Sequence, residues 1–181
     1  MRRHIVALLT VAGVFATGAG RSPRAQAPRQ KITAVPETLT DDELMWRARQ
    51  FHGHLGPWLT LGIVMGQYAV DRLGGQKYTR LHARIEVEAI APRVSILDGI
   101  QFSSGCTLGN RNLVVERPSR SRAPIRVTFV GSRGQGDTLT LEVQPSIPRQ
   151  FDRWVRSGED EKALFKRVAH MPVEQLFRVV E

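Results

Sequence analysis

The sequence predicts an α+β domain in which an antiparallel or mixed sheet of about four strands packs against helices, with extra helices at the C-terminal end. Three observations predict this class. Residues 41–51 and 57–73 carry apolar side chains at helical spacing, and residues 81–90 alternate with period two. Three further short strand candidates come next, and helical segments follow them. The chain has 181 residues, which is enough for one domain with a hydrophobic core.

The first helix is expected to run from Asp41 to about Phe51. Its start carries the residues of a capping box. A Thr40 oxygen can accept a hydrogen bond from the third amide of the helix, and Glu43 can reach back to the Thr40 amide. One face of this helix is apolar through Leu44, Ala48 and Phe51.

A second helix is expected after a short break. Gly53 ends the first helix, and Pro57 suits the first position of the next one, where no amide donor is needed. Apolar side chains nearly surround this second helix, which predicts that it is largely buried. The pair Gly74-Gly75 is expected to end it.

A strand with one buried face is predicted for "LHARIEVEAI", residues 81–90, because its apolar and polar side chains alternate. A short helix is predicted over Ile96–Ser104, with a capping box formed by Ser95 and Asp98. Gly105 is expected to end that helix. The side chains expected on the buried face of the strand are Leu81, Ala83, Ile85, Val87 and Ala89.

The remaining elements are three strands followed by three helices. The strand candidates are Asn112–Glu116, Ile125–Val130 and Leu139–Gln144. The glycine-rich segment "GSRGQGD" between the last two strands predicts a hairpin turn, since it lacks the Lys-Ser/Thr ending of a phosphate-binding loop. The helix candidates are Gln150–Arg156, Asp160–Ala169 and Pro172–Val180.

Residues 1–27 have the pattern of a secretory signal peptide: two arginines, an apolar run and a small-x-small cleavage site. Cleavage there would leave residues 28–39 as a linker or N-terminal arm. Residues 40–181 then form a single domain with a helical extension from about residue 149. An uncleaved anchor is the alternative, although the run is shorter than the roughly 20 residues of a membrane span. We expect a periplasmic or secreted protein with no stable membrane association after cleavage.

The chain is basic, with a formal net charge of +9 at pH 7. Loss of residues 1–27 would remove four arginines and no acidic residue, which leaves +5. The segment "RPSRSRAPIR", residues 117–126, could meet phosphate or an anionic surface, or it could be a solvated loop. No nucleic-acid-binding motif accompanies it, so we expect no nucleic-acid partner.

The segment "FHGHLGPW", residues 51–58, places two of the five histidines on either side of a glycine. In a loop between two helices His52 and His54 can converge, because Gly53 permits a tight backbone turn. The positive end of the following helix disfavours imidazolium, and neutral imidazole is the form that binds a metal. A metal-binding pair and an ordinary surface or structural pair both fit this pattern.

Cys106 is the single cysteine, and it follows a glycine in the polar loop "SSGCTLGN". Imidazole and thiolate together suit a borderline-soft divalent ion, of which zinc is the expected one. Asp98 could add an oxygen ligand, orient a ligand from behind, or cap the short helix. The candidate metal site therefore comprises His52, His54, Cys106 and Asp98.

Three segments, "FHGHLGPWLTLGIVMG", "IEVEAI" and "LDGIQFSSGCTLGNRNL", resemble the core of the FmdE family, which takes its name from a component of formylmethanofuran dehydrogenase. The resemblance covers roughly residues 42–130, with the motifs in the family's order and spacing. It implies an FwdE-like α+β core, a homodimer, and a cavity built from the His and Cys motifs at which a divalent metal binds. His52, His54 and Cys106 carry over by position.

The chain departs from the family pattern at Gly56 and Ser95, where members often carry cysteines. The C-terminal zinc ribbon of some members is also absent, because Cys106 is the only cysteine. Three protein ligands would leave an open coordination position, which suits an exchangeable or reactive metal. The same losses could instead mean a degenerate, empty site.

Two functions follow from these residues. One is an exported metal-binding protein with an accessory or metal-handling role and a small-molecule ligand that the sequence does not identify. The other is an enzyme of hydrolysis or acyl transfer. There Cys106 would be the nucleophile with His52 or His54 as base, or the metal would activate water. A blue-copper site with Met65 as axial ligand is a third arrangement of two His and one Cys.

Overall fold

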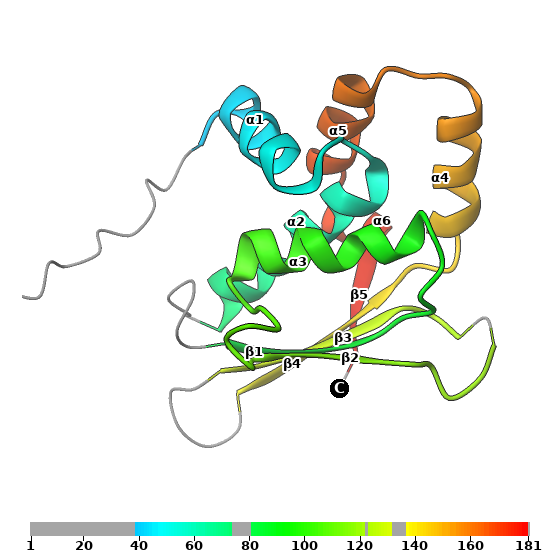
Figure 1. Cartoon of the computed structure of the whole chain (residues 1–181). Helices are drawn as coiled ribbons and strands as arrows, with labels where there is room; N and C mark the ends of the chain where they lie inside the picture. Colours follow the sequence, from blue (N-terminus) through cyan, green and yellow to red (C-terminus); the bar gives the residue numbers. More distant parts are fainter. Residues whose placement is uncertain (1–38, 74–80, 122, 132–136, 181) are drawn as a thin grey trace, which may run out of the picture. The chain divides into compact units, whose positions relative to one another are not determined.

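The helices of this protein lie on one face of a five-stranded sheet, as the computed structural model shows (Figure 1). The structure describes residues 39–73, 81–121, 123–131 and 137–180. The mixed sheet and its helices confirm the predicted α+β class. In chain order the elements are α1 (Asp41–His52), α2 (Pro57–Arg72), β1 (Leu81–Glu86), η1 (Arg93–Ser95), α3 (Ile96–Ser104), β2 (Leu113–Glu116), β3 (Arg126–Gly131), β4 (Thr138–Val143), α4 (Ile147–Arg156), α5 (Glu161–Ala169), α6 (Val173–Leu176) and β5 (Phe177–Val180).

The strand order in the sheet is β2-β1-β3-β4-β5. β1 and β2 are parallel, with Ala83 opposite Leu113, and the other neighbouring strands are antiparallel. A parallel pair needs a crossover connection, and the chain between β1 and β2 supplies it through η1 and α3. This crossover lays α3 against α2 on the covered face of the sheet (Figure 1).

The hydrophobic core lies between the sheet and these two helices. The predicted alternation is confirmed over β1, where Leu81, Ala83 and Ile85 are buried while His82 and Arg84 are exposed. α2 is largely buried, also as predicted, because its apolar side chains meet β1 on one side and α3 on the other. Burial of this apolar surface is the main term that stabilises the domain.

α2 and α3 approach so closely that two of their positions have room only for glycine. A Cβ atom at Gly62 would lie 2.2 Å from a backbone oxygen of α3, and one at Gly99 would lie 2.1 Å from a backbone oxygen of α2. Further along, Gly66 faces Ser103. The two helices therefore run in the same direction, so their N-terminal ends lie at the same end of the pair.

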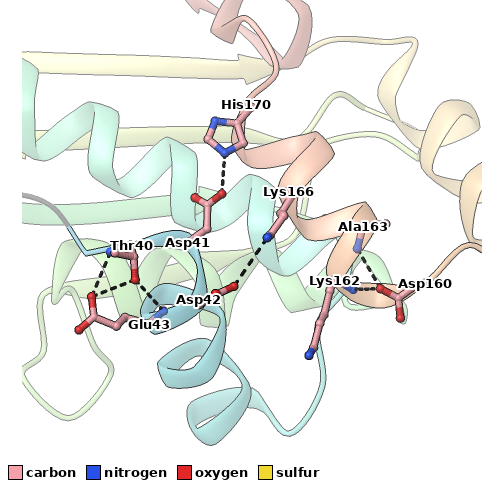
Figure 2. A network of polar contacts seen from close by, with 9 residues as sticks. All are labelled: Thr40, Asp41, Asp42, Glu43, Asp160, Lys162, Ala163, Lys166 and His170. Atoms are coloured by element: carbon pink, nitrogen blue, oxygen red, sulfur yellow. Dashed lines mark hydrogen bonds and ion pairs between the residues drawn. The ribbon is translucent and has the colours of Figure 1, made fainter.

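α1 begins with the predicted capping box, which Figure 2 shows. The Glu43 amide donates to Thr40 Oγ1 at 3.3 Å, and the Thr40 amide donates to the Glu43 carboxylate at 3.1 Å. α1 ends at Gly53, as predicted, and that residue has φ 91°. This left-handed conformation favours glycine and turns the chain towards α2.

Polar contacts also hold the first turn of α1 against α5 (Figure 2). Asp41 Oδ2 lies 2.8 Å from His170 Nε2, and Asp42 Oδ1 lies 3.6 Å from Lys166 Nζ. These side chains are mostly exposed, so each contact contributes little to stability. They lie at the start of α1, which carries His52 at its other end.

The structure differs from four predictions about individual elements. The segment predicted as a helix over Pro172–Val180 forms only the short α6, after which β5 joins the sheet. Ser95 does not cap α3, because it is the last residue of η1 and has helical dihedrals with no side-chain cap bond. Phe51, expected on the apolar face of α1, is 52% exposed, and Met45 lies in the core instead. The strand predicted over residues 81–90 also ends early, at Glu86.

Several predicted segments lie outside the described residues. These are the signal peptide, nearly all of the linker, the pair Gly74-Gly75, and residues 132–136 of the hairpin turn. The described residues all fall within one compact unit, Thr33–Glu181. None of their helices is long and apolar enough to cross a membrane.

The open face of the sheet holds a nearly buried carboxylate, that of Glu142 on β4. Glu142 is 4% exposed; it accepts from Arg126 of β3 at 2.6 Å and from Arg178 Nε of β5 at 3.1 Å. The hydrogen bond from Arg126, with that from Arg178, holds the pKa of Glu142 below its ordinary value. This carboxylate therefore links three adjacent strands through charge-assisted hydrogen bonds.

We expect Glu142→Gln to lower the free energy of unfolding near pH 7 by about 2 kcal/mol, because it weakens hydrogen bonds to two charged partners. Since the folded-state pKa is depressed, this stabilisation is present above the unfolded-state pKa and is lost as the pH falls through the folded value. Urea denaturation of both proteins near pH 7 and near pH 3 measures it. An equal difference at both pH values would contradict the assignment.

Candidate metal centre

The last turn of α1 places His52 against the first turn of α3. His52 Nδ1 lies 2.6 Å from Asp98 Oδ2, and Asp98 Oδ1 accepts a hydrogen bond from Gln101 Nε2 at 3.1 Å. The His52 side chain is only 12% exposed. The carboxylate is thus held on both oxygens, and it in turn fixes the orientation of the imidazole.

These contacts determine which His52 nitrogen is free to bind a ligand. An ionised carboxylate only accepts hydrogen bonds, so Nδ1 is the donor and Nε2 of the neutral ring carries the lone pair. Nε2 is buried and has no hydrogen-bond partner among the described residues. A fixed imidazole with a carboxylate on one nitrogen and a free lone pair on the other is the arrangement of metal-ligating histidines.

His54 stands beside His52, with the ring centroids 4.6 Å apart and the planes at 39°. The turn at Gly53 makes this possible, since two residues spaced by one on a continuous helix would diverge by about 200°. His54 is exposed. The structure therefore brings the two imidazoles of the segment "FHGH" together among the residues that line one pocket.

This pocket has a volume of about 210 Å³ and is lined by both histidines, the first turn of α2, and residues near the start of α5. Glu159 and Glu161 also line it, but each is paired. Glu159 lies 2.6 Å from Arg167, and Glu161 lies 2.7 Å from Arg49. The negative charge of each glutamate is thereby balanced by an arginine.

A larger hollow of about 420 Å³ lies on the helix-free face of the sheet. It is lined by charged side chains of β1, among them Arg84, which lies 3.6 Å from Glu116 of β2. This is a shallow surface with exposed ion pairs, which contribute little binding energy. Of the three described residues that have a buried side-chain nitrogen without a hydrogen-bond partner, two line the pocket at the histidines, so it is the better candidate.

Cys106 lies at the opposite end of α3. It follows Gly105, whose left-handed conformation ends the helix, and its Sγ donates to the Leu81 carbonyl oxygen at 3.3 Å in the core. It is eight residues beyond Asp98, or about 12 Å along a helix axis. Cys106 does not line the pocket. The described part of one chain therefore does not bring the predicted ligands His52, His54 and Cys106 together. Among the described residues, no three His, Cys, Asp or Glu side chains lie close enough together to hold a metal ion.

The surroundings of Cys106 are those of a structural thiol. Its side chain is 0% exposed, and burial raises the pKa of the thiol above its ordinary value. We expect iodoacetamide to label Cys106 in the native protein more slowly than it labels free cysteine. In the protein unfolded by urea, Cys106 should react at the rate of free cysteine. Mass spectrometry over a time course measures both rates. Fast native labelling would restore Cys106 as a candidate nucleophile.

Two residues of this site were not identified from the sequence. Gln101 follows Asp98 by three positions on α3, so helical spacing could have indicated it as the second partner of that carboxylate. Trp58 lines the pocket, and its buried Nε1 has no hydrogen-bond partner among the described residues. No sequence signal could have found that property, because an unpartnered indole depends on packing. Asp98 itself occupies the place that its predicted orienting role requires.

Comparison with known proteins places these residues in a family. The family model described as "FmdE, Molybdenum formylmethanofuran dehydrogenase operon" matches residues 51–178, which is most of the chain. A similar protein is a "Probable S-adenosyl-L-methionine-binding protein" from Archaeoglobus fulgidus, 38% identical over 88 residues. That alignment covers 48% of this chain and only 22% of the relative, so this chain matches a small part of that protein. The family match contains His52, His54, Asp98 and Cys106, and the chain belongs to the FmdE family.

Proposed function

We propose that this chain is an accessory protein that binds a divalent transition metal, with zinc as the expected ion, through His52 and His54. The observation that carries the proposal is the buried lone pair of His52 Nε2, which has no partner among the described residues although Asp98 fixes the ring. The adjacent His54 ring supplies a second imidazole 4.6 Å away, centre to centre. The family's description, which names the operon of a molybdenum enzyme, supports a metal-related role.

In this proposal His52 and His54 are the protein ligands, and Asp98 is a positioning residue. The carboxylate holds the Nδ1 proton and so keeps Nε2 available to the ion. Two imidazoles leave coordination positions for water or a ligand, which is typical of exchangeable and reactive sites. Cys106 is left out of the ligand set because it lies in the core at the far end of α3.

Two enzymatic mechanisms are expected from the sequence, nucleophilic attack by Cys106 and activation of water by the metal, and only the second is retained. Cys106 is buried with a raised thiol pKa, so nucleophilic attack by this residue is not favoured. A zinc-activated water at the histidine pair is the form that agrees with the geometry. Export of the chain and its assembly as a homodimer remain predictions from the sequence.

The experiment that tests the proposal is a zinc titration of metal-free protein, with Asp98→Asn as the informative variant. We expect one zinc per chain in the wild type. For Asp98→Asn we expect an affinity lower by about 10–100-fold, because the positioning carboxylate is lost while both imidazoles remain. Competition with a chromophoric chelator measures these affinities. Unchanged zinc affinity in Asp98→Asn would contradict the positioning role of Asp98, and unchanged affinity in His52→Ala would show that the ion binds elsewhere.

A further inference from the structure

The hollow on the helix-free face of the sheet, about 420 Å³ in volume, has no part in the proposed metal function. It lies over β2, β1 and β3, and none of its lining residues lines the histidine pocket. Two of the side chains that line it are guanidinium groups, those of Arg84 on β1 and Arg111 in the turn before β2. The hollow is therefore a separate feature with basic groups of its own.

The turn before β2 fixes the backbone of Arg111. The Arg111 amide donates to the Leu108 carbonyl oxygen at 3.0 Å, and the residue has φ 57°, a left-handed conformation that is uncommon outside glycine. The next side chain, that of Asn112, accepts from the Thr107 amide at 2.8 Å and donates to the Leu81 carbonyl oxygen at 3.0 Å. These bonds tie the turn to the start of β1, so Arg111 extends from a fixed point beside the hollow.

The charges of the open face leave Arg111 without a counter-ion among the described residues. Cross-strand register places three glutamates and three other arginines on this face of the described strands: Glu86, Glu116, Glu142, Arg84, Arg126 and Arg178. Their formal charges cancel. The Arg111 side chain forms no ion pair or hydrogen bond with a described residue, so its positive charge is the surplus at the hollow.

Two guanidinium groups in one hollow favour an anion with several acceptor oxygens. A guanidinium donates in pairs to the oxygens of phosphate or carboxylate. Arg84 is 62% exposed and its contact with Glu116 is 3.6 Å long, so little is lost when Arg84 turns to a ligand. A phosphomonoester carries a charge of about −1.5 to −2 near pH 7, which matches two arginines better than the single charge of a monocarboxylate.

Exposed aliphatic surface lies beside these arginines. Val114 of β2 is opposite Arg84 and is 49% exposed, and Val130 of β3 is 39% exposed. Both line the hollow, whose volume of about 420 Å³ is that of a small-molecule site rather than of a site for a bare ion. An organic group attached to the phosphate can cover these two side chains.

We propose that this hollow binds a small organic phosphomonoester, with the phosphate held by Arg111 and Arg84 and the organic group packed on Val114 and Val130. The inference goes beyond the proposed metal function. Because the hollow and the histidine pocket share no lining residue, phosphomonoester binding and zinc binding can be gained or lost separately.

The test is a titration of the ¹⁵N-labelled full chain with phenyl phosphate at pH 8 in the presence of EDTA, followed by NMR. We expect saturable shifts of the Val114 and Val130 amide signals, weaker binding of inorganic phosphate and no binding of benzyl alcohol. Affinity for phenyl phosphate should fall about tenfold in Arg111→Gln, which loses charge-assisted hydrogen bonds. Arg111→Lys keeps the charge without the paired donors, so it should recover only part of that loss.

Arg120→Gln is the matched control, because Arg120 is also exposed, has no described side-chain partner and does not line the hollow. Its affinity should equal that of the wild type. Equal weakening in Arg111→Gln and Arg120→Gln would mean general attraction to a basic surface and would overturn the inference.

Two results with the wild type alone would also overturn the inference, even if the Arg111 variants failed to fold. One is the absence of saturable shifts at Val114 and Val130. The other is inorganic phosphate binding as tightly as phenyl phosphate, which would leave the organic group without a role. Zinc affinity is measured on the same protein without EDTA. Zinc binding without phenyl phosphate binding sinks only this inference, and the reverse result sinks only the metal proposal.

Discussion

His52→Ala is expected to lower the zinc affinity of the protein by about 100-fold or more, the largest effect of any single change at the site. The variant removes the one ligand that is already oriented, since Asp98 holds His52 Nδ1 at 2.6 Å. Asp98 then has no imidazole to hold, and it does not orient the second ligand, His54, in place of the first. His54→Ala is expected to lower the zinc affinity less, because His54 is exposed and lies beside the His52 ring rather than against the Asp98 carboxylate.

His82→Ala is the control for this comparison. His82 is exposed on β1, on the face of the sheet that the helices do not cover, and it does not line the histidine pocket. Its removal should leave zinc affinity and stoichiometry unchanged. If His52→Ala and His82→Ala bind zinc equally well, the imidazole of His52 is not a ligand.

Gly99→Ala is expected to destabilise the fold by about 3 kcal/mol, against the usual stabilising effect of alanine within a helix. A Cβ atom at this position would lie 2.1 Å from the Leu59 carbonyl oxygen and 2.7 Å from the Ile63 amide nitrogen. Both are backbone atoms of α2, so no side-chain rotation relieves the overlap. The helices must separate, and core packing between them is lost.

Urea denaturation measures this loss, with Gly109→Ala as the control. A Cβ atom at Gly109 has only one neighbour within 4 Å among the described residues, at 3.9 Å, so that variant should unfold with nearly wild-type stability. Gly99 also neighbours Asp98, so Gly99→Ala should weaken zinc binding as the first turn of α3 moves. A Gly99→Ala protein as stable as Gly109→Ala would mean that α2 and α3 pack less closely than described.

Local signals predicted most of the helices and strands of this chain. The capping box at Thr40 and Glu43 and the Pro57 start depend on neighbouring residues, and both form as expected. The alternation of apolar and polar side chains in β1 indicates a sheet with one buried face, and a few consecutive residues are enough to recognise it. β5 could not be read in this way. Its four residues follow a helical turn, and what makes them a strand is the free edge of β4 beside them.

Part of the site was also predictable, because some of its contacts are made between residues that are close in the sequence. His52 and His54 are near neighbours in sequence, so a glycine turn suffices to predict that their rings meet. The contact of His52 with Asp98 depends on the packing of α1 against α3. From the sequence, an orienting role for Asp98 was only one of three options, beside those of a metal ligand and a helix cap. The position of Cys106 depends on the length of α3. A thiol at the end of a helix whose start holds Asp98 cannot reach the same pocket within one chain.

The most direct measurement is a crystal structure of the zinc-loaded protein with anomalous data collected at the zinc edge. The account predicts a zinc peak about 2.1 Å from His52 Nε2, the usual zinc–imidazole distance, with His54 as a second ligand and the Asp98 contact retained. A zinc ion bound away from His52, or crystals grown with zinc that show no peak at the histidine pair, would contradict it.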